Sequence, residues 1–257
     1  MKSKHMSRRQ FLAAVGAGLA LAGWRPLASA QAAEPSPSER PNVLFIGIDD
    51  LNDWIGCLGG HPDIKTPNID RLAARGVLFS NAHCAAPACN PSRAALMTGI
   101  RPSTSGVYHN PQPWRRSPVL KDAVTLPQHF MAHGYRVLGS GKMFHGAYPD
   151  PRSWHDYWPA KDRQKPGDPM PPNRPLNGIP KTAHFDWGPV DAPDEQMGDW
   201  QVTDWVCDRL ADKHDKPFFL ACGVYRPHLP WYVPRKYFDL YALGSITLPE
   251  VKEDDLE

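Results

Sequence analysis

The sequence has few cysteines, and their spacing excludes the common cysteine-based sites. Five cysteines occur among 257 residues, namely Cys57, Cys84, Cys89, Cys207 and Cys222. No CxxC pair or zinc-like spacing is present, so a zinc ribbon and a thioredoxin-like redox centre are excluded. The chain is also too long and too poor in cysteine to be a small disulfide scaffold. In an exported protein an odd number leaves at least one cysteine unpaired, and the pairing of the others stays open.

The sequence has no surplus of positive charge beyond its first 30 residues. Five of its 29 basic residues lie in that stretch, which contains no acidic residue, so 24 basic side chains face 27 acidic ones in the remainder, a net charge of −3. We therefore predict that no nucleic acid is a partner. Apolar residues make up 41% of the chain and charged residues 22%. This usage excludes a wholly disordered chain.

The sequence also lacks an apolar run long enough to span a membrane, which needs roughly 20 residues. The run at residues 13–23 is shorter and rich in Gly and Ala, and it follows Ser7-Arg8-Arg9-Gln10-Phe11-Leu12. Ala28-Ser29-Ala30 supplies the small residues of a cleavage point. Residues 1–30 are thus predicted to be a twin-arginine export signal, recognised by the twin-arginine export machinery, and residues 31–41 a flexible spacer. The predicted location is the periplasm or the outside of the cell, and the alternative interpretation is a disordered basic tail.

Strand and helix patterns alternate from residue 42 onward. The predicted strands are residues 43–48, 77–80, 135–138 and 218–224, and the predicted helices follow Thr66, Thr125 and about Asp199. The run Val43–Ile48 is continuously apolar, as expected of a strand buried on both faces of a parallel sheet. The alternation predicts an α/β fold in which a largely parallel central sheet is sandwiched by helices. Residues 146–198, rich in proline, are predicted to run over the surface.

Charged side chains follow the ends of three predicted strands. They are Asp49, Asp50, Lys142 and His228, and ligands of parallel sheets bind beyond the carboxyl ends of strands. Two adjacent carboxylates in an apolar setting each cost several kcal/mol to ionise unless a cation offsets them. A hard divalent cation such as Ca²⁺ or Mg²⁺ suits oxygen ligands. The alternative is that one aspartate caps a turn and the other faces water.

A second pattern places Cys89 at the N-terminus of a helix. In Cys89-Asn90-Pro91-Ser92-Arg93, Pro91 suits a first helical turn, and Gly99 suits the end of the helix. Free N–H groups and the helix dipole at this end attract an anion. Arg93 lies one turn further on nearly the same face and adds a fixed positive charge. Taken alone, these residues fit equally well a buried cysteine beside a salt-bridged arginine.

These segments resemble the sulfatase family of the alkaline-phosphatase-like superfamily. Cys89–Arg93 with Leu96-Met97-Thr98-Gly99 is similar to the family signature C-x-P-S-R and its downstream T-G, which a maturation enzyme reads when it oxidises the cysteine to formylglycine. Residues 41–50 and 66–73 resemble the opening strand, the metal-binding aspartates and the following helix. Gly141-Lys142-Met143-Phe144-His145 and Tyr225–Pro230 are similar to the K-x-x-H and K/R-P-H-x-P segments of iduronate-2-sulfatase-like members.

The resemblance implies hydrolysis of sulfate esters, with sulfated saccharides as substrates and a formylglycine-generating maturation enzyme as a partner. Residue 89 would become a hydrated aldehyde, of which one hydroxyl attacks sulfur and the other expels sulfate. One Ca²⁺ would be bound by Asp49, Asp50 and residue 89. The implied catalytic residues are Cys89 itself, Arg93 to steady the hydrate, Lys142 to pair with sulfate, His145 to accept the proton of the diol, and His228 to contact sulfate near the leaving oxygen.

The sequence departs from the family pattern in one respect. Members of the family complete the metal site with a later D-H-G or D-N-G segment and a further lysine, none of which is present here. We therefore expect residues 42–257 to be an incomplete N-terminal catalytic domain, truncated before the C-terminal part of the fold. Two alternatives stay open, a phosphoester or phosphonate hydrolase on the same scaffold and an inactive fragment with an incomplete metal site.

Overall fold

The computed structural model describes residues 40–182, 184–251 and 254. The predicted export signal and all but the end of the predicted spacer lie outside the described residues. Among the residues described, no helix is long and apolar enough to cross a membrane.

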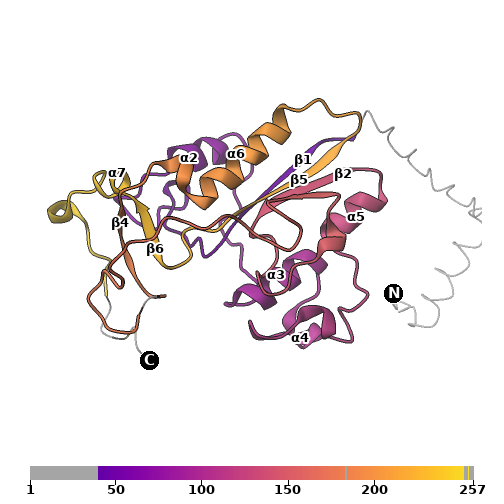
Figure 1. The fold of residues 1–257 in the computed structure, drawn as a ribbon, viewed down its shortest axis with the longest axis horizontal. Helices are drawn as coiled ribbons and strands as arrows, with labels where there is room; N and C mark the ends of the chain where they lie inside the picture. The colour runs from indigo at the N-terminus through magenta and orange to yellow at the C-terminus, as the bar shows by residue number, and fades with distance from the viewer. Residues whose placement is uncertain (1–39, 183, 252–253, 255–257) are drawn as a thin grey trace, which may run out of the picture. The chain divides into compact units, whose positions relative to one another are not determined.

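A four-stranded sheet forms the centre of the described chain (Figure 1). Its strands are β1 (Val43–Ile48), β5 (Phe218–Val224), β2 (Arg136–Gly141) and β3 (Asp156–Trp158), in the order β1-β5-β2-β3. All three pairings are parallel, and Ile48 and Gly141 pair with Val224 and Gly223 at the ends of their strands. The carboxyl ends of β1, β2 and β5 therefore meet at one edge of the sheet.

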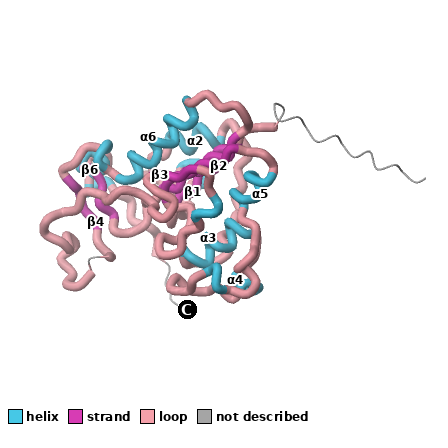
Figure 2. The backbone as a smooth tube through the Cα atoms, turned by 45° about the vertical axis from the view of Figure 1, so that its right-hand side comes forward, coloured by secondary structure: helices cyan, strands magenta, loops and turns pink. Residues whose placement is uncertain are grey.

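Strand β5 shows how this sheet is covered on both faces. Its residues Phe218, Leu220 and Cys222 pack with Val202 and Val206 of helix α6 (Gly198–Ala211). The intervening Phe219 and Ala221 belong to the larger core on the opposite face, which includes residues of α3 (Cys89–Thr98) and α5 (Leu126–Ala132). Figures 1 and 2 show α6 on one side of the sheet and α3 and α5 on the other. The fold is thus the predicted helix-covered α/β sheet.

The remaining elements are short. They are the α-helices α2 (Pro67–Ala73), α4 (Pro102–Ser105) and α7 (Arg235–Phe238), the parallel strand pair β4 (Trp187–Val190) and β6 (Trp231–Pro234), and 3-10 turns at Gly56–Leu58, Trp114–Arg116, Pro151–Ser153, Asp194–Gln196 and Leu243–Ser245. Residues 146–198 do not simply run over the surface as predicted, because β3 joins the sheet and Trp154 and Tyr157 are buried.

Two predictions about strands are wrong. Residues 77–80 form no strand, and Val77 and Phe79 are exposed without a neighbouring strand among the described residues. Strand β1 is not buried on both faces, since Leu44 and Ile46 are 43% and 50% exposed. These two residues lie on the face of Leu220 and Cys222, with which they pair, and helix α6 on that face packs against β2 and β5 rather than against the edge strand β1.

Candidate active site

The two adjacent aspartates after β1 lie in opposite environments. The backbone N–H of Asp49 donates to the carbonyl of Val224 at 3.0 Å and so continues the β1–β5 ladder. The Asp49 side chain is 6% exposed. Asp50 has a left-handed backbone, with φ 58°, and its side chain is 54% exposed. The change of backbone conformation between the two residues sends one carboxylate into the protein and the other toward solvent.

Two buried cations face the carboxylate of Asp49. Arg93 Nη2 lies 2.6 Å from Oδ1, and Lys142 Nζ forms an ion pair with Oδ2. Burial alone would raise the pKa of Asp49, but the two cations outweigh it and hold this pKa below its ordinary value. A buried carboxylate needs a cation nearby to stay ionised, and at Asp49 the protein itself supplies two, Arg93 and Lys142.

Cys89 is the first residue of α3, and Ala88 before it has an extended backbone. Its thiol donates to Asp49 Oδ2 at 3.8 Å and lies 3.5 Å from Lys142 Nζ. Burial raises the pKa of the thiol above its ordinary value, and the charges of Asp49 and Asp50 add to this effect while Lys142 opposes it. An unmodified Cys89 is therefore a neutral thiol at pH 7, which is a poor nucleophile compared with a thiolate.

Lys142 follows β2 directly and is 3% exposed. Its backbone carbonyl accepts a hydrogen bond from Arg93 Nη1, which also donates to the carbonyl of Met143 at 3.3 Å. The ammonium group lies 4.5 Å from the centre of the Tyr225 ring. Arg93 thus binds the main chain of Lys142 and also the Asp49 carboxylate, with which the Lys142 side chain forms its ion pair.

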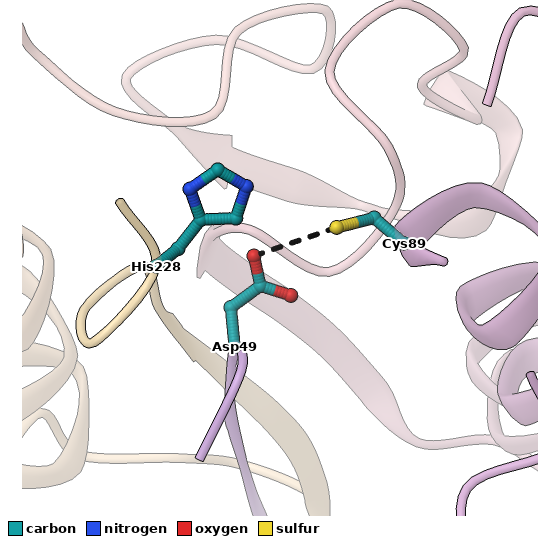
Figure 3. A group of neighbouring side chains, drawn as sticks. All are labelled: Asp49, Cys89 and His228. Atoms are coloured by element: carbon teal, nitrogen blue, oxygen red, sulfur yellow. Dashed lines mark hydrogen bonds between the residues drawn. The ribbon is translucent and has the colours of Figure 1, made fainter. Parts of the chain in front are cut away.

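His228 lies in the loop after β5 and points toward Asp49 and Cys89 (Figure 3). One ligand atom from each of these three residues lies within 4.8 Å of the other two. The Nδ1–H of His228 donates to the carbonyl of Leu229 at 2.6 Å, which leaves Nε2 facing Asp50 Oδ2 at 3.9 Å. The loop therefore brings Asp50 back into contact with the group.

His145 lies near this group without a hydrogen bond to it among the described residues. Its Nδ1 atom is buried and has no partner in the part of the chain that the structure describes. Burial lowers the pKa of His145 below 6.5, and the charges of Lys142 and Arg93 lower it further, against a smaller effect of Asp49. The imidazole is consequently neutral at pH 7 and has a free nitrogen that can accept a proton.

The carboxylates of Asp49 and Asp50 fit a hard divalent cation, whereas the thiol of Cys89 does not. Asp49, Asp50, Cys89 and Arg93 line an open pocket of about 250 Å³, and carboxylate oxygens suit Ca²⁺. Oδ1 of Asp49 has a second lone pair beside the one that Arg93 engages, whereas Oδ2 accepts from both Lys142 and the Cys89 thiol until position 89 loses its S–H. The sulfur of an unmodified Cys89 is a soft ligand and does not suit such an ion. An oxygen at position 89 would complete a set of hard donors.

Three residues that surround this group have no role predicted from the sequence. Tyr225 stacks its ring near His228, with 4.7 Å between the ring centres, in addition to its contact with Lys142. Asp199 and Asp168 bind the loop that carries His228. The position of Tyr225 directly after a strand end is a signal that could have drawn attention to it. No local pattern in the sequence indicates that Asp199 and Asp168 bind Tyr225 and Arg226, which lie 26 and 58 positions further along the chain.

Comparison with known proteins identifies relatives over nearly all of the described chain. A family model described as Sulfatase matches residues 41–255. A sulfatase of Formosa agariphila is 42% identical over 228 residues, which cover 85% of this chain and 45% of the relative. Iduronate 2-sulfatase of Mus musculus is 34% identical over 83% of this chain and 40% of its own length.

A solved structure, the phosphonate monoester hydrolase of Agrobacterium radiobacter, is similar with a TM-score of 0.57 and 25% identity. The match covers 81% of this chain and 45% of that one. The chain therefore spans less than half the length of each of these three proteins.

Proposed function

Because the chain belongs to the sulfatase family, we propose that its protein hydrolyses sulfate esters of saccharides with a formylglycine made from Cys89. The observation that carries this proposal is the position of the Cys89 sulfur, 3.5 Å from Lys142 Nζ and 3.8 Å from Asp49 Oδ2 at the N-terminus of α3. A saccharide substrate is supported by the likeness to iduronate 2-sulfatase. Residues 42–257 are, in this proposal, an N-terminal catalytic portion.

The two absent groups would each supply one kind of chemistry. A formylglycine at position 89 would supply, as its hydrate, one hydroxyl as a nucleophile that displaces the alcohol from sulfur and a second hydroxyl whose deprotonation would allow sulfate to leave. A Ca²⁺ held by Asp49, Asp50 and the oxygen at position 89 would act as a Lewis acid on the sulfate oxygens. The hard donor set described above supports this choice of ion.

The protein's own side chains would hold the charge and move the protons. Lys142 already lies beside the position-89 side chain and would pair with the sulfate group, while Arg93 holds the main chain of Lys142 in place. Nδ1 of neutral His145 would accept the proton of the second hydroxyl. His228 Nε2, the ring nitrogen that faces Asp50, would in the protonated ring donate to the oxygen of the departing alcohol.

The test compares substrates with the protein expressed from its complete open reading frame together with a formylglycine-generating enzyme. We expect turnover of an aryl sulfate that exceeds turnover of an aryl phosphonate at least tenfold, is removed by a calcium chelator and is restored by Ca²⁺. The matched control is Cys89→Ser, which cannot be oxidised to the aldehyde by the same route and should be inactive. Activity of Cys89→Ser equal to that of the wild type would contradict the proposal.

The likeness to a phosphonate monoester hydrolase supports a second candidate, hydrolysis of phosphonate or phosphate esters at the same site. A tetrahedral phosphorus group offers the same oxyanions to Lys142 and the metal. Faster turnover of the aryl phosphonate than of the aryl sulfate in the experiment above would favour this candidate.

We also propose export through the twin-arginine route to the periplasm or beyond, from the Arg8-Arg9 segment. Replacement of both arginines by lysine should retain the protein in the cytoplasm, while Lys2 and Lys4 replaced by arginine should leave export intact. Cell fractionation measures both, and export of the Arg8→Lys, Arg9→Lys protein at the wild-type level would contradict this route.

A further inference from the structure

His228 is carried by a loop with little secondary structure of its own. The segment Tyr225–Pro230 lies between β5 and β6, and its internal backbone hydrogen bond is from His228 N–H to the carbonyl of Tyr225 at 3.1 Å. One such bond does not determine where an imidazole points, because a loop of this length has many conformations of similar energy. The hydrogen bond from His228 Nδ1 to the carbonyl of Leu229 orients the ring relative to the loop, so contacts that tie the loop to helix α6 and to Asp168 fix where the loop places that ring.

The first contact comes from helix α6. Asp199, in the first turn of this helix, accepts the N–H of Tyr225 on Oδ1 and the N–H of Arg226 on Oδ2, both at 2.8 Å. The carboxylate thus binds two successive N–H groups at the point where the chain leaves β5. Burial raises the pKa of Asp199, an effect that these two hydrogen bonds and Lys165 oppose. Helix α6 itself packs on the sheet through Val202 and Val206. The Asp199 carboxylate therefore has a position set by a helix that is held against the core.

The second contact comes from Arg226. Its Nη1 donates to the backbone carbonyl of His228 at 2.7 Å, and its Nη2 forms an ion pair with Asp168 at 2.7 Å. Asp168 is in turn bound by Lys165 at 2.7 Å and by the N–H of Gly198, the first residue of α6, at 2.8 Å. Arg226 therefore connects the main chain of His228 to the same end of α6 that bears Asp199.

We propose that Asp199 and Arg226 are positioning residues that hold His228 against Asp49 and the position-89 side chain. Neither residue touches the reacting atoms in this proposal. The inference rests on the proposed function, because it assumes that His228 acts on the departing alcohol in sulfate ester hydrolysis.

The test is a double-mutant cycle with the matured protein from the complete reading frame and an aryl sulfate. Asp199→Asn keeps the size of the side chain but replaces one acceptor oxygen by an NH₂ group, and it should lower kcat at least tenfold with KM changed less than threefold. In a His228→Ala background the same substitution should change kcat less than twofold, because residues that act through one group are not additive. Asp204→Asn, on an exposed position of α6, is the control and should leave kcat unchanged.

A merely structural role predicts a different result. It would lower the melting temperature and the folded fraction, and its effect on kcat would be the same with and without His228. That outcome would overturn the inference. If Asp199→Asn does not fold, Arg226→Met decides in the same cycle, because a methionine can donate neither to Asp168 nor to the His228 carbonyl.

A readout that needs no activity separates this inference from the proposed function. The ring C–H resonance of His228 in an NMR spectrum, assigned with His228→Ala, should shift in Asp199→Asn and stay in place in Asp204→Asn. An inactive wild type would contradict the proposed function alone, whereas an unshifted resonance in Asp199→Asn would overturn the positioning role.

Discussion

Asp49 and Asp50 differ in burial although they are adjacent in the sequence, and this difference separates their roles. Asp49 is buried between Arg93 and Lys142, while the side chain of Asp50 is 54% exposed. The pair could be predicted from the sequence as a charged cluster at a strand end. That Arg93 and Lys142 both bind the Asp49 carboxylate itself could not, because these ion pairs join residues 44 and 93 positions apart and depend on tertiary packing.

Substitution of the two aspartates should therefore have unequal effects on stability. Asp49→Asn leaves two buried cations without their counter-charge and should lower the free energy of unfolding by about 3–5 kcal/mol. Asp50→Asn removes an exposed charge and should change it by less than about 0.5 kcal/mol. Denaturant unfolding measures both, and calorimetric calcium titration of the matured protein should show weaker binding in each. Equal stability of the two variants, or unchanged calcium affinity in Asp50→Asn, would contradict this assignment.

The lowered pKa of His145 predicts the acidic limb of the pH–rate profile. The unfolded chain takes up a proton on this imidazole near pH 6.5, whereas the folded protein does so only at lower pH. Stability from this group is thus complete above pH 6.5 and is lost as the pH falls from 6.5 toward the lowered pKa. Catalysis needs the neutral ring of His145, so kcat should fall as the pH drops through the lowered pKa of this residue.

Two histidine variants test whether His145 causes that limb. His145→Gln should lower kcat, and the residual activity of this variant should lack the acidic limb of the pH–rate profile. His155, whose pKa burial also lowers, lies outside the site, so His155→Gln should alter the pH dependence of stability and leave the limb of kcat in place. A limb that persists unchanged in His145→Gln would exclude this residue as the proton acceptor.

At the scale of elements, local signals predicted most of the regular structure. Strands β1 and β5 have the predicted bounds, and α3 begins at Cys89 and ends before Gly99, whose φ is 71°. Thr125 caps α5 through a hydrogen bond from Gln128. The errors arise where tertiary neighbours decide, as at Val77 and Phe79, which have β-forming side chains but no described strand beside them.

The close approach of the parallel strands β2 and β5 at their carboxyl ends positions Lys142, and the paired glycines Gly141 and Gly223 make it possible. Gly141 has φ 81°, and a Cβ atom there would overlap the Gly223 carbonyl. Gly141→Ala should therefore cost about 1–2 kcal/mol for the left-handed backbone and about 1–3 kcal/mol more for the overlap, with a loss of kcat because Lys142 is displaced.

Gly134 provides the matched control for this prediction. Its φ is 82°, and a Cβ atom there would have no neighbour within 4 Å. Gly134→Ala should cost only the backbone contribution and leave kcat unchanged. Thermal or denaturant unfolding of both variants checks the difference, and equal destabilisation by the two substitutions would contradict the role of the close approach between Gly141 and Gly223.

At the scale of the whole molecule, the parallel sheet collects site residues from distant parts of the chain. Asp49 and Lys142 follow β1 and β2, His228 follows β5, and Cys89 begins α3 against the same edge. The convergence could be predicted from the rule that strand ends meet at one edge. The loop contacts that orient His228 could not, since Asp168 and Asp199 carry no local signal of their partners.

The most direct test is the mass of the peptide that contains residue 89, measured after expression of the complete reading frame with a formylglycine-generating enzyme. Exchange of the thiol for an aldehyde lowers the mass by about 18 Da, and we predict this loss in the wild type and its absence in Cys89→Ser. A wild-type peptide that keeps the mass of unmodified cysteine, in protein that nevertheless hydrolyses sulfate esters, would contradict the central claim.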